Sequence, residues 1–196
     1  MAGIGRDGIT LGILAGGRAT RLGGRDKAWL RRDGISQVER LQRKFRGEVA
    51  RVLASANRGP ERYAALGIEV VADRVEGFGP VAGLHALAHA CATPWLFTVP
   101  VDVVDLNECL LRTLVAAARG NGACAVDDDG PQPLVALWRT QALRAACADA
   151  IARDLHAVRV LTDALAMAEC RFEGVRFGNL NTPEDLAAAG IDAGPD

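Results

Sequence analysis

A short apolar run that leads into a glycine-rich, cationic loop is the feature that most constrains this sequence. The run spans 9–14, and the segment after it carries Gly16, Gly17, Arg18, Arg21, Gly23, Gly24, Arg25 and Lys27. Glycine lets a backbone approach an anion closely and direct its N–H groups at it, while cations neutralise the charge. The spacing is that of neither a Walker A loop nor a G-x-G-x-x-G dinucleotide loop. The segment therefore predicts a polyphosphate site at the end of a strand.

Short apolar runs alternate with helix-like segments along the chain. The predicted strands span 9–14, 49–54, 69–72, 95–101 and 123–126. The predicted helices span 36–45, 60–66, 81–91 and 106–118, and an Ala-rich helical stretch from 138 to about 168 precedes a last apolar run at 172–177. Nearly uninterrupted apolar strands separated by helices predict a layered α/β fold around a mostly parallel sheet. In such folds, ligands bind where the strands end.

Length and charge narrow the possible functions. A chain of 196 residues fits a single domain, and its net charge of -1 provides no general attraction for nucleic acid or an anionic membrane. The basic residues gather locally between Arg18 and Arg32, which favours a small anionic ligand. The five cysteines form no C-x-x-C pair, and no apolar run approaches the roughly 20 residues of a membrane span. These features predict a cytoplasmic protein with reduced thiols, no nucleic-acid partner and no membrane segment.

Three predicted strands lead to side chains suited to nucleotide and metal chemistry. Asn57 follows the second strand, Asp73 the third and Asp102 the fourth. Magnesium takes one or two protein carboxylates together with phosphate oxygens, so an aspartate opposite a cationic glycine loop suits a magnesium-bound triphosphate. A helix N-cap or turn is the structural alternative for Asp102.

Further polar motifs have simpler interpretations. His85 and His89, four residues apart, lack the Glu of a zinc-protease motif and are predicted to be structural or solvent-facing. The acidic stretch 127–129 is predicted to be a solvated hairpin tip, with a metal site as the alternative. The segment 79–83, G-P-V-A-G, predicts a tight loop that enters a helix. Near the end, Thr182 is a good N-cap, and residues 190–196 are predicted to form a frayed tail.

Several of these motifs, in order, resemble the molybdenum cofactor guanylyltransferases. The resemblance runs from Ile9 to Leu186 and rests on L-A-G-G-x-x-x-R-L-G-x-x-D-K, A-N-R, V-V-A-D, G-P-V-A-G, P-V-D and N-x-N-T-P-E-D-L. It implies a Rossmann-like three-layer α/β/α nucleotidyltransferase domain over 1–196. The part to about residue 105 would bind nucleotide, and the part from about 120 to 190 would face the pterin. The implied reaction joins GMP from GTP to the terminal phosphate of molybdopterin or Mo-molybdopterin, with Mg²⁺ as cofactor and cofactor-delivery proteins as partners.

The resemblance also implies roles for particular residues. The implied nucleotide-binding residues are Leu14, Ala15, Gly16, Gly17, Lys27, Asn57, Asp73 and Asp102. Arg21, Lys27 and Asp102 would be catalytic, and Asp102 would be the metal ligand. Asn179 and Asn181 match the pair on the pterin side, and Arg159 loosely matches a nearby basic position.

The sequence departs from the family pattern in three places, the mildest being Thr20 and Leu22 in the glycine loop, and leaves three further functions open. Val103, Val104 and Asp105 stand where the family shows a small or hydroxylated residue and a proline, and Ser36 and Gln37 also differ. The first open function is a cytidylyltransferase for the same cofactor, which would begin its loop with A-A-G, whereas Gly17 leaves room for a larger purine. The second is a sugar-phosphate nucleotidyltransferase, and the third is a non-catalytic adaptor that binds nucleotide or cofactor.

Overall fold

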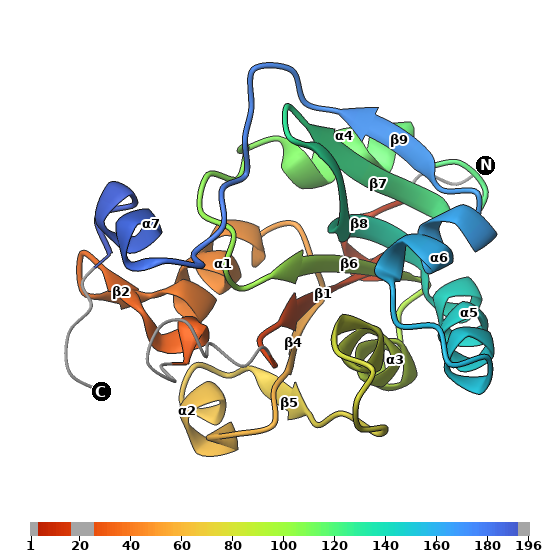
Figure 1. The fold of residues 1–196 in the computed structure, drawn as a ribbon, viewed down its shortest axis with the longest axis horizontal. Coiled ribbons are helices and arrows are strands. Elements are labelled where there is room, and N and C mark those ends of the chain that lie inside the picture. The colour runs from red at the N-terminus through yellow and green to blue at the C-terminus, as the bar shows by residue number, and fades with distance from the viewer. Residues whose placement is uncertain (1–3, 17–25, 192–196) are drawn as a thin grey trace.

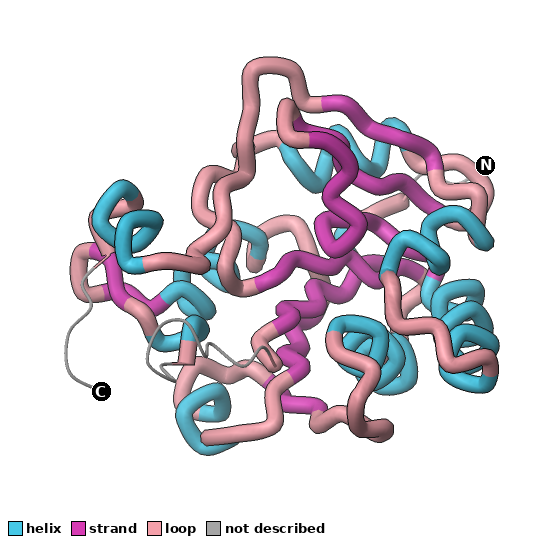
Figure 2. The backbone as a smooth tube through the Cα atoms, in the orientation of Figure 1, coloured by secondary structure: helices cyan, strands magenta, loops and turns pink. Residues whose placement is uncertain are grey.

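A seven-stranded sheet runs through the centre of the protein, and helices cover both of its faces (Figures 1 and 2). The computed structural model describes residues 4–16 and 26–191. The sheet has the order β5-β4-β1-β6-β8-β7-β9. Its strands are β1 (Ile9–Leu14), β4 (Arg51–Ser55), β5 (Glu69–Val71), β6 (Trp95–Pro100), β7 (Gly122–Asp127), β8 (Gly130–Arg139) and β9 (Ala168–Arg171). Only β8 runs against its neighbours, so the predicted α/β fold with a mostly parallel sheet is confirmed.

The helices divide between the two faces of the sheet. They are α1 (Gln37–Phe45), α2 (Pro60–Ala64), α3 (Pro80–Ala90), α4 (Leu110–Ala117), α5 (Thr140–Ala152), α6 (Val158–Ala164) and α7 (Pro183–Ala188). Side chains of α1, α2 and α4 share one core with alternate residues of β1 such as Leu11 and Ile13. Side chains of α3, α5 and α6 share a second core that includes Leu96 and Trp138. None of the helices in the described segments is long and apolar enough to cross a membrane.

Gly12 in β1 lets α3 pack directly against the middle of the sheet. A Cβ atom at this position would lie 3.0 Å from Leu87 Cδ1 and 3.1 Å from Leu96 Cδ1. Such contacts are tighter than normal van der Waals packing, so a side chain here would push the helix outward. The glycine thereby fixes how closely α3 approaches the strand that leads into the glycine loop.

The predicted elements differ from the observed ones most in the C-terminal third. The predicted helix to about residue 168 ends with α6 at Ala164, and Ala166 has a φ of 48°, which interrupts helical geometry. The apolar run at 172–177 does not form a strand, and the strand nearest to it is β9, which pairs with β7 and buries Cys170. Phe172 and Phe177 are buried all the same. Apolar content located the core residues but did not locate the strand.

A small hairpin that follows the glycine loop in the sequence was not predicted. It consists of β2 (Arg31–Arg32) and β3 (Ile35–Ser36). Asp33 and Gly34 form its turn with φ angles of 54° and 76°. An Asp-Gly pair is a common two-residue hairpin signal, so the sequence did contain the information.

Asp127 at the β7–β8 turn is buried, so the predicted solvated hairpin tip is wrong at this residue. Its side chain accepts hydrogen bonds from the backbone N–H groups of Phe177 (2.9 Å) and Asp129 (3.0 Å) and from the Gln132 amide (3.0 Å). Burial raises the pKa of Asp127, but the hydrogen bonds outweigh it and hold the pKa below its ordinary value. The carboxylate therefore ties the hairpin to the chain that leads towards α7.

Asp127→Ala is expected to lower the free energy of unfolding at pH 7 by about 2 to 3 kcal/mol, because its donors lose their acceptor. A depressed folded-state pKa makes this contribution present above the unfolded-state pKa of about 4 and lost as pH falls through the folded-state value. Urea unfolding at pH 7 and near pH 3 would measure it. Asp129→Ala, at an exposed residue 3.5 Å from Arg176, is the control and should change stability by less than about 1 kcal/mol. Equal losses in both variants, or a loss independent of pH, would contradict this assignment.

Candidate nucleotide and metal site

The C-terminal ends of β1, β4, β5 and β6 meet at one edge of the sheet. β1 lies between β4 and β6, parallel to both. Backbone hydrogen bonds continue beyond the strands, from Ala15 N to Ser55 O (2.9 Å) and from Val101 N to Leu14 O (3.0 Å). The chain passes from β1 to β4 on one side and later returns to β6 on the other. This edge is therefore the topological switch point, where α/β sheets bind their ligands.

Asn57 and Asp73 form a pair after β4 and β5. Asn57 Nδ2 donates to Asp73 Oδ2 (2.9 Å), and Asp73 N donates back to Asn57 Oδ1 (3.0 Å). Ser55 Oγ donates to Asp73 Oδ1 (3.2 Å). A Cβ atom on Gly16 would lie 3.8 Å from Asp73 Oδ2, so the start of the loop adjoins this pair. The structure thus brings together three residues that the sequence assigned to nucleotide binding, namely Gly16, Asn57 and Asp73.

Ser55 is a member of this cluster that the sequence analysis missed. It is 1% exposed and is the last residue of β4. A polar residue directly after the apolar stretch 52–54 was the available signal. Its buried hydroxyl donates to one oxygen of the Asp73 carboxylate, and the exposed Asn57 amide donates to the other.

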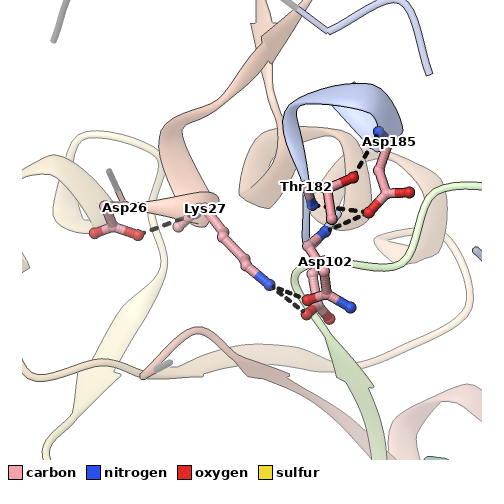
Figure 3. A network of polar contacts seen from close by, with 7 residues as sticks. Asp26, Lys27, Asp102, Thr182 and Asp185 are labelled. Atoms are coloured by element: carbon pink, nitrogen blue, oxygen red, sulfur yellow. Dashed lines mark hydrogen bonds and ion pairs between the residues drawn. The ribbon is translucent and has the colours of Figure 1, made fainter. Parts of the chain in front are cut away.

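Lys27, Asp102 and Asn181 form a second cluster from three distant parts of the chain (Figure 3). Lys27 Nζ donates to Asp102 Oδ2 (2.9 Å) and to Asn181 Oδ1 (2.7 Å). The side chains of Lys27 and Asp102 are 15% and 24% exposed. Asp26 begins the 3-10 turn η3 (Lys27–Trp29), with its side chain accepting from Ala28 N (3.0 Å). This cap fixes the backbone from which Lys27 extends.

Asp102 fits the role of a magnesium ligand that acts together with substrate phosphates. Its carboxylate is partly exposed at a strand end and already attracts a cation, the Lys27 ammonium group. Within residues 4–16 and 26–191, His, Cys, Asp and Glu form no group of three or more that could hold a metal ion. Magnesium commonly binds through one or two carboxylates and completes its shell with phosphate oxygens and water. The donor set therefore suits a metal that arrives with a nucleotide.

Two of the predicted residues within the described part of the chain, Asn179 and Arg159, do not join these clusters. The side chain of Asn179 is exposed, and its backbone carbonyl accepts from Asn181 N (3.2 Å). Arg159 lies on α6 and pairs with Asp163 (3.7 Å), and α6 and α7 lie at opposite ends of the protein (Figure 1). Gly17 and Arg21 lie outside the described residues.

The G-P-V-A-G segment places the start of α3 beside the Asn57–Asp73 cluster. Gly79 has a φ of 52° and Pro80 begins the helix. A Cβ atom on Gly83 would lie 2.9 Å from both Ser55 Oγ and Leu14 Cδ2. The segment was predicted to form a tight loop entering a helix, and this is confirmed. Its second glycine allows the helix to touch the ends of β1 and β4.

His85 and His89 lie one turn apart on α3. The rings meet edge to face with their centroids 4.5 Å apart. Burial, together with the charge of the other histidine, lowers the pKa of His85, and burial together with Arg74 lowers that of His89. His85 is half-buried and His89 exposed, which agrees with the structural or solvent-facing interpretation.

The strand-end clusters, at the switch point of a mostly parallel sheet, define an α/β nucleotide-binding domain. The sequence profile of the MobA-like NTP transferase domain matches residues 11–169. The chain therefore belongs to the MobA-like NTP transferase family.

Similar proteins agree with this family. The molybdenum cofactor guanylyltransferase of Serratia proteamaculans is 36% identical over 90% of this chain and 91% of its own. That of Yersinia pseudotuberculosis is 34% identical over 90% of this chain and 92% of its own. The crystal structure of molybdopterin-guanine dinucleotide biosynthesis protein A from Archaeoglobus fulgidus has a TM-score of 0.68 and 22% identity, and covers 92% of this chain and 96% of that one. The inositol-1-phosphate CTP transferase of T. maritima has a TM-score of 0.75 with 15% identity, and covers 93% and 92%.

Gly83→Val is expected to lower the free energy of unfolding by about 1 to 3 kcal/mol, because the new side chain overlaps Ser55 and Leu14. It should also weaken nucleotide binding, since Ser55 orients Asp73. Gly47→Val is the matched control, because a Cβ atom there meets nothing within 4 Å. Thermal unfolding and nucleotide titration would measure both effects. If the two variants behaved alike, the close approach of α3 would have no energetic role.

Proposed function

We propose that this protein transfers GMP from GTP to the terminal phosphate of molybdopterin, forming molybdopterin guanine dinucleotide and pyrophosphate. The observation that carries the proposal is the cluster of Lys27, Asp102 and Asn181, in which a partly exposed carboxylate and an ammonium group meet at a strand end. The relatives that share 34 to 36% of their residues with this chain are named molybdenum cofactor guanylyltransferases. Apart from Ser55, the residues that form both clusters fall on the motifs that carry this resemblance.

The chemistry demands positioning and charge neutralisation more than a protein base. A phosphate oxygen of the acceptor would attack the α-phosphorus of GTP, and pyrophosphate would leave. The phosphate is already anionic, so no side chain needs to remove a proton. Lys27 would donate to the nucleotide phosphates, and Arg21 with the loop backbone from Leu14 to Gly17 would hold the remaining phosphate oxygens. Asp102 would hold Mg²⁺, which when bound neutralises phosphate charge.

The Asp73 carboxylate supports guanine as the donor base. A carboxylate offers about four acceptor positions, and Asn57 and Ser55 each use one, on different oxygens. Among the described residues, each oxygen keeps a position that would match the adjacent N1–H and N2–H₂ groups of guanine, whereas the corresponding edge of cytosine offers one amino group beside an acceptor nitrogen. The fold alone does not distinguish GTP from CTP, because the inositol-1-phosphate CTP transferase of T. maritima has a similar fold. Gly17 would add room for the purine.

The proposal extends to the organisation of the chain. Residues 1–196 would form a single nucleotidyltransferase domain, with the donor nucleotide bound by the part before about residue 105. The part from about 120 to 190 would face the pterin, through Asn181 and the exposed side chain of Asn179. A cytoplasmic location and transfer of the product to cofactor-delivery proteins would follow from this role.

A direct test incubates the purified protein with Mg²⁺, either GTP or CTP, and either molybdopterin or a hexose phosphate, and measures pyrophosphate. We expect release with GTP and little with CTP. Release with CTP alone would identify a cytidylyltransferase, and release that requires a hexose phosphate would identify a sugar-phosphate enzyme. Nucleotide binding without any release would identify an adaptor. Each of these three outcomes would overturn the proposal.

Lys27→Ala and Asp102→Ala are each expected to lower kcat for GMP transfer by about two to three powers of ten, because each removes a group that stabilises charge in the transition state. Lys44→Ala is the matched control, since Lys44 lies on α1 and outside both clusters. Steady-state pyrophosphate release would provide the rates, and circular dichroism would show that the fold is kept. Normal turnover by either variant would remove that residue from the mechanism.

A further inference from the structure

The chain after β9 contacts both Lys27 and Asp102, through Asn181 and Leu180 respectively. Leu180 N donates to Asp102 O (2.9 Å), which ties the segment to the residue proposed to hold the metal. Leu180, Leu186 and Ile191 pack with Leu30, close to η3, in a cluster separate from the two main cores. The segment 180–191, called the closing segment below, therefore joins the Asp102 loop to the turn that carries Lys27.

Asp185 holds the part of the closing segment that contacts Lys27. Its Oδ2 atom accepts from Thr182 N (2.8 Å) and from Asn181 N (2.9 Å), as Figure 3 shows. The bond to Thr182, with the return bond from Asp185 N to Thr182 Oγ1 (3.2 Å), forms a capping box at the start of α7. The bond to Asn181 N lies beyond what the capping box requires. It fixes the backbone of the residue whose side chain accepts from Lys27.

The exposed position of Asn181 makes this anchoring necessary. An exposed side chain exchanges freely among rotamers unless its backbone and its partner hold it. Asn181 Oδ1 nevertheless lies 2.7 Å from Lys27 Nζ. Hydrogen bonds from Asn181 N and Thr182 N hold the pKa of Asp185 below its ordinary value, so the carboxylate stays ionised across the neutral range.

We propose that Asp185 is a positioning residue that acts through Asn181 to set the direction of the Lys27 ammonium group. Asn181 then serves the donor side of the reaction as well as the pterin side. The closing segment lies near the end of the sequence, and it thereby orients Lys27, which comes soon after β1. This role rests on the proposed function only for its effect on turnover, since the geometry itself can be measured without substrate.

Lysine NMR tests the geometry directly. Lys27 and Lys44 are the lysines of this chain, so ¹³C,¹⁵N-lysine labelling gives one signal set for each, assigned with Lys44→Arg. Asp185→Ala should speed proton exchange at Lys27 Nζ by about threefold to tenfold, the range that the loss of one hydrogen bond corresponds to. Lys44 should not change in the same sample. Asp185→Asn keeps the size of the side chain but loses its charge, and it should also speed proton exchange at Lys27 Nζ. This variant provides the test if the alanine variant folds poorly.

Thr182→Ala separates positioning from helix stability. It removes the hydroxyl that caps α7 but leaves the backbone N–H groups of residues 181 and 182 free to donate to Asp185. Both Asp185→Ala and Thr182→Ala should therefore lower the melting temperature, whereas only Asp185→Ala should change the Lys27 signals. If both variants changed the Lys27 signals, or if neither did, the positioning role of Asp185 would be overturned.

Kinetics complete the test. Asp185→Ala should lower kcat for GMP transfer by about threefold to tenfold with a smaller change in the KM for GTP, and Thr182→Ala should leave kcat close to the parent value. An unchanged kcat alongside a displaced Lys27 signal would overturn the link to turnover. If the parent protein transferred no GMP while the lysine signals responded as described, the proposed function would fail and the positioning of Lys27 by Asp185 would stand.

Discussion

The parallel pairing of β1 with β4 on one side and β6 on the other determines where the functional side chains lie. Parallel strands end at the same edge, so Gly16, the Asn57–Asp73 pair and Asp102 converge although they are far apart in sequence. Gly12 and Gly83 make this arrangement compact, because they let α3 contact the sheet and the strand ends without intervening side chains. A shift in this pairing would separate the two clusters.

The sequence was most informative where a short local pattern determines the backbone. The apolar run at 9–14 coincides with β1, and the Thr182 cap with Pro183 and Asp185 occurs as expected. The convergence of Asn57 with Asp73 also followed from the rule that parallel strands end together. The strand at 168–171 could not be recognised, because Ala168 and its neighbours favour helix locally and only pairing with β7 makes them a strand.

Side-chain partners over long distances were the part that the sequence could not supply. The resemblance assigned Lys27 to phosphate and Asn181 to the pterin, yet the two are hydrogen-bonded to each other. Asp127 looks like a turn residue in the sequence, but the backbone N–H of Phe177, 50 residues later, is one of its donors. Such contacts depend on how the chain returns after the sheet is complete, and no local pattern encodes that return.

The two clusters are supported in different ways, and this difference bears on function. Asn57 follows the inner strand β4 and Asp73 follows the edge strand β5, and the buried Ser55 that contacts Asp73 is itself the last residue of β4, so a bound base would meet a surface built on the sheet. Asn181 is instead held by the closing segment, whose apolar cluster is small and separate from the main cores. Regions with few buried contacts open at lower free-energy cost than core strands do. Under the proposed function, the acceptor side would therefore adjust to a bulky pterin while the base side would keep its geometry, with the Asp185 carboxylate keeping Asn181 and Lys27 together.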